Sequence, residues 1–293
     1  MIKKVCLVFL ALVVVLLAAA GVAWKLNGER WQQEYAAFRK TGAPVLMYHA
    51  VGPEEGADWP KTLIMKPELF ESHLQYLKEQ GYTIVTVAEL AERLQQGKSV
   101  DKYVALSFDD GYKNNHSVVL PLLKKYDAKG SFFVINKDIG DELHMNEQEI
   151  KELIAAGMEL GSHTYSHNPL AAIDEKYLVW ETDTSRYWLK KKFDGYIVRT
   201  LAYPNGSYNE RVIAAAKKYG FYRALTGHVG VNTAATYQKA PFEMYRVTVA
   251  DDGNGLEGFK KRLEQAYFFG FLQTFPGFGI VLNKEVILGC THM

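Results

Sequence analysis

Residues 104–114 read VALSFDDGYKN, an apolar run that ends in two adjacent aspartates and a glycine. The apolar half predicts a buried strand, and Gly111 predicts a turn directly after it. Asp109 and Asp110 place two like charges at the end of that strand. The simplest interpretation is a turn in which an aspartate caps the following helix. The alternative, a pair of functional carboxylates, depends on which residues stand at the ends of the other strands.

The composition is that of an ordinary globular protein and gives no sign of nucleic-acid binding. The chain has 293 residues, of which 48% are hydrophobic and 23% charged, with 34 basic against 33 acidic side chains. No basic run is interleaved with aromatic residues, so we expect no nucleic-acid partner. The two cysteines, Cys6 and Cys290, suit neither a metal site nor an intrachain disulfide. The oligomeric state is not predicted.

The first 24 residues predict a membrane segment. Lys3 and Lys4 precede the run 5–24, which has no charged residue, and Lys25 follows it. A helix of about 20 residues spans roughly the 30 Å of a bilayer core. We therefore expect an uncleaved signal anchor and a single-pass protein of the cell membrane with its domain outside the cytoplasm. The alternative is secretion after cleavage, because the small residues 18–20 suit a signal peptidase.

Strands and helices alternate along the rest of the chain. The apolar, β-rich runs that predict strands are 45–48, 83–86, 103–108, 131–135, 159–162, 200–203, 223–226 and 246–249. The amphipathic patterns that predict helices are 66–80, 87–96, 115–126, 146–156, 174–192, 209–219 and 256–267. Repeated strand–helix units predict an α/β fold with parallel strands, which closes most simply into a barrel.

Four segments follow from these patterns. They are a signal anchor at 1–24, a helical stalk at 25–42, one catalytic domain at 43–267, and a tail at 268–293 that fits no further strand–helix unit. In a barrel of this kind, the loops after the carboxyl ends of the strands build the active site. The polar residues just past each strand are therefore the candidates for chemistry.

Two histidines follow the predicted strand 159–162, in the segment GSHTYSH. Imidazole nitrogens suit zinc and other divalent metals, and His163 and His167 point the same way if their loop makes one helical turn. With one carboxylate they would make three ligands and leave positions open, as in a catalytic metal site. The other aspartate would then take a proton from the bound water. For the histidine pair alone, two unrelated surface or core residues remain an alternative.

Three ordered motifs resemble the polysaccharide deacetylase family, carbohydrate esterase family 4, also called the NodB-homology domain. They are SFDDG, HTYSH and R-x4-PNG, with PVLMYH near the start and RVTVADDGNGLEGFKKRL near the end, and the likeness covers residues 43–263. The resemblance implies a deformed (β/α)7 barrel. It also implies metal-dependent hydrolysis of acetamide groups on an N-acetylglucosamine polymer of the cell surface, either peptidoglycan or poly-N-acetylglucosamine.

The resemblance assigns roles to the motif residues. Asp109 would be the catalytic base, and Arg199 would orient it. Asp110, His163 and His167 would hold the metal. Two histidines and one carboxylate suit zinc first, although cobalt, nickel, manganese or iron fits the same open site.

Residues next to the motifs are the expected contacts to substrate. By the resemblance, the backbone around Pro204, Asn205 and Gly206 would line the pocket and help to bind the oxyanion. Tyr112 and Tyr165 lie beside motif residues and are expected to stack on sugar rings, or alternatively to fill the mouth of the barrel. The aromatic residues of the predicted helix 174–192, namely Trp180, Tyr187 and Trp188, are interpreted as core residues.

One feature of the family has no counterpart in this sequence. Many members carry the general acid in a late Leu-x-His motif, but the nearest late histidine here is His292, and the matching apolar stretch has Asn283. We therefore predict that His49, at the end of the first strand in PVLMYH, supplies the acid. The alternative is a structural histidine beside the strand.

Two other functions stay open on the same fold. A surface carbohydrate-binding protein without turnover would explain the missing late motif, although a pure binder needs no Asp109. An O-acetyl esterase would also fit, because an oxygen leaving group needs less help from an acid.

Overall fold

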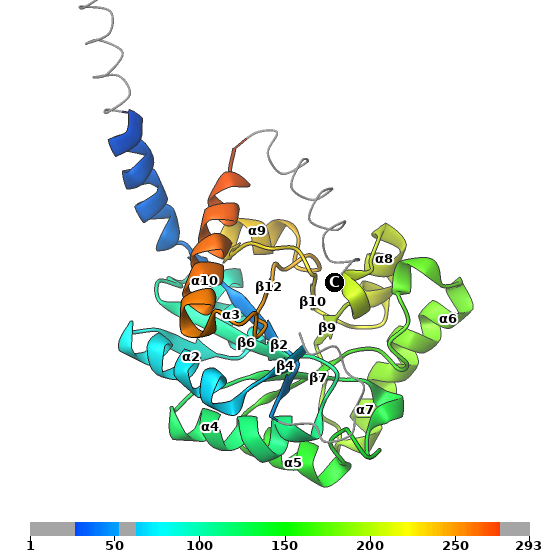
Figure 1. The fold of residues 1–293 in the computed structure, drawn as a ribbon. Helices are drawn as coiled ribbons and strands as arrows, with labels where there is room; N and C mark the ends of the chain where they lie inside the picture. The colour runs from blue at the N-terminus through cyan, green and yellow to red at the C-terminus, as the bar shows by residue number, and fades with distance from the viewer. Residues whose placement is uncertain (1–26, 53–62, 276–293) are drawn as a thin grey trace, which may run out of the picture. The chain divides into compact units, whose positions relative to one another are not determined.

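The computed structural model describes residues 27–52 and 63–275, which divide between two compact units (Figure 1). In the first unit, Met1–Lys40, residues 27–39 form a helix. Within the described ranges, no helix is both long and apolar enough to cross a membrane. The predicted anchor 1–24 lies outside these ranges.

The second unit, Thr41–Met293, is an α/β domain around a curled sheet. Its strands are β2 (Val45–Tyr48), β5 (Thr83–Val85), β6 (Tyr103–Phe108), β7 (Ser131–Val134), β8 (Glu159–Ser162), β9 (Thr200–Ala202), β10 (Arg223–Leu225) and β12 (Val247–Thr248). The order is β10-β9-β8-β7-β6-β2-β12, with β5 beside β6, and every pairing is parallel. Each strand coincides with a predicted one, so the predicted α/β architecture is confirmed.

The two ends of this sheet approach each other. A parallel bridge joins Leu225 of β10 to Met244, in the segment that leads into β12. The Met244 N–H donates to Ala224 O, and the Thr226 N–H donates to Met244 O, both at 3.0 Å. The sheet therefore curls around a central core, and the carboxyl ends of its strands meet at one rim.

Helices surround the sheet. They are α2 (Pro67–Glu79), α3 (Val87–Gln95), α4 (Leu120–Lys125), α5 (Glu147–Ala155), α6 (Glu175–Val179), α7 (Ser185–Lys192), α8 (Glu210–Lys218), α9 (Ala234–Lys239) and α10 (Gly255–Leu272). The local sequence determines where two of these helices begin. Thr86 with Glu89 forms a capping box at the start of α3, and Asn146 with Glu149 forms one at the start of α5. Figure 1 shows α2, α4, α5 and α7 on the outer face.

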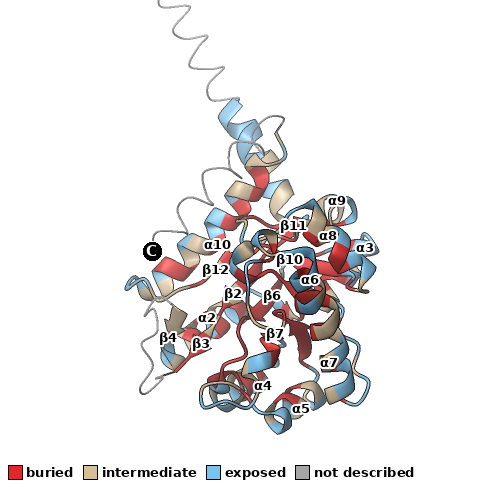
Figure 2. Ribbon diagram, turned by 90° about the vertical axis from the view of Figure 1, so that its right-hand side faces the viewer, coloured by how far each residue is buried: buried red, intermediate tan, exposed pale blue. Residues whose placement is uncertain are grey.

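Apolar side chains fill the inside of the curl. One buried cluster contains strand residues Val45, Ala105, Phe133, Ala202 and Leu225 together with Leu90 and Leu94 of α3 and Tyr237 of α9. Helix α3 starts at the amino-terminal end of the sheet, where the Ala88 N–H donates to Glu159 Oε2 at 2.8 Å. Figure 2 shows the strands as almost entirely buried. The opposite rim is left for polar groups.

Several local elements differ from the prediction. The predicted helix 174–192 is interrupted by a π-helical turn, Trp180–Thr184, between α6 and α7. Helix α10 continues to Leu272, into the predicted tail, while residues 276–293 lie outside the described ranges. The short elements β11 (Asn232–Thr233) and α9 were not predicted. Strand β11 exists through its antiparallel pairing with β1 (Gly42–Ala43), which a local pattern does not reveal.

Candidate active site

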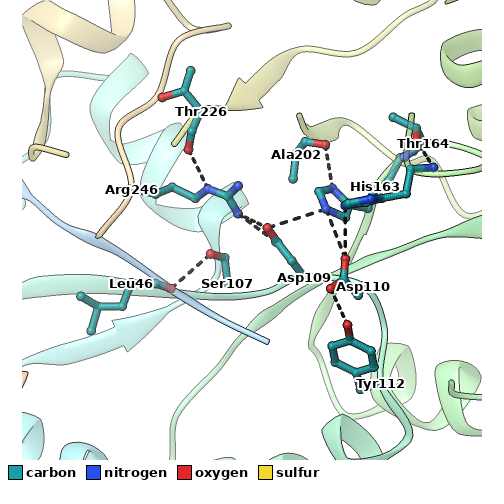
Figure 3. A network of polar contacts seen from close by, with 12 residues as sticks. Leu46, Ser107, Asp109, Asp110, Tyr112, His163, Thr164, Ala202, Thr226 and Arg246 are labelled. Carbon is teal, nitrogen blue, oxygen red and sulfur yellow. Dashed lines mark hydrogen bonds and ion pairs between the residues drawn. The ribbon is translucent and has the colours of Figure 1, made fainter. Parts of the chain in front are cut away.

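The two aspartates Asp109 and Asp110 leave β6 at the polar rim of the sheet (Figure 3). Asp109 is 2% exposed and Asp110 is 8% exposed. Asp110 has a φ of +71°, a left-handed conformation that the surroundings must hold in place. Gly111 follows at φ +85°, and a Cβ there would lie 3.0 Å from a Val134 methyl group, so glycine is required. Because of this tight turn, the two carboxylates point in different directions and contact different residues.

Asp109 is bound by an arginine. Nη1 of Arg246 donates to its two oxygens at 2.8 and 2.7 Å, and Nε of Arg246 donates to Thr226 O at 2.9 Å (Figure 3). Arg246 is itself 2% exposed. Burial would raise the pKa of Asp109, but Arg246, together with His163 and His49, holds that pKa below its usual value. Asp109 is therefore ionised at neutral pH.

The predicted orienting residue, Arg199, lies elsewhere. It precedes β9, and its guanidinium lies 5.1 Å from the centre of the Tyr222 ring. It lines a cavity of about 400 Å³ with Glu89 and Glu159, beside the start of α3. Arg246 makes the contact with Asp109, so the role predicted for Arg199 is wrong. The cause is geometric, since Arg199 and the PNG segment flank the same strand at its two opposite ends.

Asp110 lies with two histidines in a second cluster. Nε2 of His163 and Nε2 of His167 are 3.4 and 3.6 Å from Asp110 Oδ1. Among the described residues this buried oxygen has no hydrogen-bond partner, whereas Oδ2 accepts a bond from the Tyr112 hydroxyl at 2.7 Å. Nδ1 of His163 donates to Ala202 O at 2.9 Å, which leaves its Nε2 lone pair facing the carboxylate.

These features fit a divalent cation. The three ligand atoms lie within 4.8 Å of one another. A buried carboxylate oxygen without a donor, facing two imidazole nitrogens, is a donor set that a cation would satisfy. Burial lowers the pKa of His163 against the opposing effect of both aspartates, which favours the neutral imidazole that binds metals. The three residues predicted as ligands are thus brought together.

A buried glutamate shapes the loop that carries the histidines. Glu181, in the π-helical turn, is 2% exposed. Its carboxylate accepts the N–H groups of Tyr165 and Ser166 at 2.9 and 2.8 Å, and also bonds the Ser166 hydroxyl and the Asn168 amide. His167 has a φ of +62° within this loop. Glu181 was not predicted from the sequence, because it lies in a helical pattern that looks like an ordinary exposed surface.

His49 lies at the same rim, directly after β2. Its backbone oxygen accepts a bond from Nδ2 of Asn115 at 2.9 Å. Burial lowers the pKa of its imidazole, while Asp110 and Asp109 act in the opposite direction. The charges of both aspartates therefore act on His49. The strand-end position predicted for it is the one observed.

Comparison with known proteins identifies the family. The family model described as polysaccharide deacetylase matches residues 96–224. The YxkH protein of Bacillus subtilis (strain 168), whose name assigns it to the polysaccharide deacetylases, is 33% identical over 216 residues, which cover 72% of this chain and 73% of that protein. This chain belongs to the polysaccharide deacetylase family. It is a hydrolase of carbohydrate esterase family 4, the class that acts on amide bonds.

Two further proteins similar to this chain are also deacetylases. The poly-β-1,6-N-acetyl-D-glucosamine N-deacetylase of Staphylococcus aureus (strain MSSA476) is 26% identical over 206 residues, covering 66% of this chain and 70% of that protein. The deacetylase PplD of Streptococcus pyogenes, solved in complex with acetate, superimposes with a TM-score of 0.67 at 28% identity and covers 78% of this chain and 99% of its own. The curled parallel sheet is thus the fold of this family.

The predicted substrate contacts lie at the rim of this deacetylase. Tyr112 is 6% exposed, and its ring stacks on His144 with centroids 5.1 Å apart. It therefore positions Asp110 and offers little surface to a sugar. Tyr165 is half-buried and its ring meets the edge of Trp180, with centroids 5.1 Å apart.

The PNG segment forms a tight turn, Pro204–Gly206, directly after β9. Pro204 is buried and Asn205 is exposed with a φ of +54°. A Cβ on Gly206 would lie 3.3 Å from the backbone nitrogen of Gly227, so glycine lets these two loops approach closely. The turn is at the His163 side of the rim, because Ala202 O accepts the bond from His163.

The helix 174–192 of the deacetylase exposes its aromatic residues. Trp180 is 48% exposed and Tyr187 is 64% exposed, so their prediction as core residues is wrong. Trp188 is half-buried, with the Lys192 ammonium 5.2 Å from its ring centre. Leu178 and Leu189 supply the buried face, and the wide π-helical turn shifts which residues face inward.

Proposed function

We propose that this deacetylase removes acetyl groups from N-acetylglucosamine units of a cell-surface polysaccharide, with the help of a divalent cation. One arrangement carries the proposal. Asp110, His163 and His167 form a cation-binding cluster, while the neighbouring Asp109 is ionised and held away from it by Arg246. Such a division provides a ligand and a base from adjacent residues.

Zinc suits the two imidazoles and one carboxylate best, and cobalt, nickel, manganese or iron fits the same donor set. When bound, the cation would polarise the acetamide carbonyl and lower the pKa of a water. Asp110 and the two histidines would hold it. The Tyr112 hydroxyl, bonded to Asp110 Oδ2, and the Ala202 carbonyl, bonded to His163, orient two of these ligands.

Asp109 acts as the general base in this proposal. Its carboxylate is ionised and lies 3.9 Å from the Nε2 atom of His163, at the edge of the cation cluster. From there Asp109 accepts a proton from the attacking water. The Arg246 guanidinium fixes the carboxylate through both oxygens, so little reorganisation is needed when the proton moves.

His49 acts as the general acid. It is a histidine outside the cation cluster, directly after β2, and the charges of both aspartates act on its pKa. Burial favours the neutral form of the His49 imidazole. In this proposal it takes up a proton from solvent and passes that proton to the amide nitrogen, which allows the sugar amine to leave. This assignment supplies the acid that the missing late motif would otherwise provide.

An N-acetylglucosamine polymer is the substrate best supported. The named activity of the Staphylococcus aureus relative supports poly-β-1,6-N-acetylglucosamine, and peptidoglycan is the alternative. The exposed Asn205 turn and Tyr165 lie at the rim, where such a polymer would contact the protein. The curled sheet also supports the deformed (β/α)7 barrel implied by the family resemblance.

The location of the enzyme is proposed from sequence alone. The uncharged run 5–24, behind Lys3 and Lys4, supports a membrane anchor with the catalytic domain outside the cytoplasm. Protease digestion of intact cells tests this location. Degradation of the catalytic domain without lysis supports it, and protection until lysis contradicts it.

Acetate release tests the function. The purified full-length chain in detergent is incubated with N-acetylglucosamine oligomers and, separately, with O-acetylated sugars, after chelation and after return of zinc. We expect zinc-dependent acetate release from the oligomers. Release from the O-acetylated sugars alone would establish an esterase instead, and oligomer binding without release would establish a carbohydrate-binding protein.

A further inference from the structure

An aromatic pair, the exposed Trp180 and the half-buried Tyr165, lies at the loop that carries two of the cation ligands. The Trp180 ring and the Tyr165 ring meet edge to face, with centroids 5.1 Å apart and planes at 66°. Trp180 is 48% exposed, and Tyr165 lies between His163 and His167 in sequence. The Trp180 ring therefore contacts the loop that carries His163 and His167.

The pair is held in a fixed position. Glu181, the residue after Trp180, accepts the backbone N–H groups of Tyr165 and Ser166 at 2.9 and 2.8 Å. This buried carboxylate ties the histidine loop to the start of the π-helical turn. A preordered aromatic surface loses little conformational entropy when a ligand binds.

The exposed aromatic residues near Trp180 do not contribute to the hydrophobic core. The buried side of α6 is supplied by Leu178, whereas Tyr177 is 58% exposed and lies three residues before Trp180. Residues three apart are neighbours on a helix, so Tyr177 enlarges the same apolar area. Exposed apolar patches beside a site commonly mark a binding surface.

We propose that Trp180, held by Tyr165, is a stacking subsite for a sugar residue flanking the one that is hydrolysed. This inference rests on the proposed function for the identity of the polymer. A pyranose ring presents an apolar C–H face that packs on a flat aromatic ring, and its hydroxyls remain in water. A neutral N-acetylglucosamine polymer that enters the rim extends past Tyr165 onto Trp180, and Tyr177 widens the platform.

Binding of defined oligomers tests the subsite. Full-length protein in detergent is titrated by calorimetry with β-1,4- and β-1,6-linked N-acetylglucosamine pentamers and with the monosaccharide. We expect Trp180→Ala to weaken pentamer binding about tenfold and Trp180→Phe to retain most of the affinity. Monosaccharide binding stays unchanged. Tyr187→Ala, which removes a more exposed aromatic residue of the following helix α7, is the matched control and leaves pentamer affinity unchanged.

Kinetics provide a second readout. The loss in Trp180→Ala appears as a higher KM for pentamers with kcat unchanged, since a flanking subsite does not touch the reacting atoms. Pentamer affinity equal to wild type in Trp180→Ala overturns the inference, as does the absence of pentamer binding by the wild type. Pentamer binding that depends on Trp180 but occurs without acetate release refutes the proposed function alone.

Discussion

Arg246 donates from one nitrogen, Nη1, to both carboxylate oxygens of Asp109, at 2.8 and 2.7 Å, across 137 positions of sequence. Both side chains are at most 3% exposed. The pair explains how a buried aspartate stays ionised next to a second aspartate. It also explains why adjacent residues are suited to different tasks, because Asp109 is engaged by an arginine while Asp110 faces two histidines.

Replacement of Arg246 tests this relationship. Without the guanidinium, burial raises the pKa of Asp109, so the acidic limb of the pH profile of kcat/KM moves to higher pH in Arg246→Met. We also expect a loss of about 3–5 kcal/mol in stability, because a buried charge is left unpaired. Arg246→Lys keeps a positive charge and shifts the limb less.

Arg199→Met is the matched control for that experiment. Arg199 lies beside Tyr222 at the other end of β9. Its replacement leaves the pH profile in place. A profile that moves in Arg199→Met but not in Arg246→Met would contradict the assignment.

Glu181 is expected to act on cation affinity through the histidine loop. Glu181→Gln keeps the shape of the side chain but weakens its bonds to the N–H groups of Tyr165 and Ser166. We expect the affinity for zinc to fall about 10- to 100-fold, as for other residues that orient metal ligands. Zinc affinity is measured by competition with a chelating dye.

Glu159→Gln provides the comparison, because Glu159 is also a buried acceptor but bonds Ser131 and Thr200 at the start of the sheet. It lowers stability without an effect on zinc affinity. Equal zinc affinities for Glu181→Gln and the wild type would refute the positioning role.

His49 is expected to matter more for amides than for esters. An amine leaves only after protonation, whereas an alkoxide needs less help. We therefore expect His49→Gln to lower kcat on N-acetylglucosamine oligomers by about 100-fold, typical of a general acid. Turnover of an activated acetate ester falls only a few-fold. Near-normal amide turnover with zinc still bound would return His49 to a structural role.

We expect His73 to make the fold sensitive to acid. It is 1% exposed, packs on Phe259 with ring centroids 4.0 Å apart, and burial lowers its pKa to about 3. The unfolded chain binds a proton near pH 6.5 and the folded chain does not. The contribution of the neutral His73 to the free energy of unfolding is therefore fully present above that pH, and it is lost as the pH decreases from 6.5 towards 3.

The His73→Leu variant removes this titration. Between pH 6.5 and 5, the wild type should lose about 1–2 kcal/mol more stability than the variant, since each pH unit is worth at most about 1.4 kcal/mol. Urea unfolding at both pH values measures the difference. Parallel losses in both proteins would show that other groups cause the acid sensitivity.

The sequence predicted the parts of this protein that depend on local patterns. Apolar runs located all eight strands of the main sheet. Because the carboxyl ends of parallel strands meet at one rim, the sequence also predicted that Asp109, Asp110, His163 and His167 lie there together. The family resemblance assigned these residues their expected roles. Both kinds of inference use residues that are close in sequence or follow one simple rule of barrel geometry.

Local sequence patterns did not predict contacts between residues that are far apart in the sequence. Arg246 begins the last predicted strand, but its contact with Asp109 depends on how the sheet curls, which no single segment encodes. Glu181 has a helical neighbourhood, and its role arises from N–H groups on a different loop. Trp180 was placed in the core because regular helical periodicity was assumed, and the π-helical turn breaks that periodicity.

The most direct measurement compares Asp109→Asn with Asp110→Asn for bound zinc and for acetate release from N-acetylglucosamine oligomers. If the adjacent aspartates divide base and ligand, Asp109→Asn retains zinc and loses at least about 100-fold in turnover, whereas Asp110→Asn loses both zinc and turnover. Equal zinc loss in the two variants, or normal turnover in Asp109→Asn, would contradict this division.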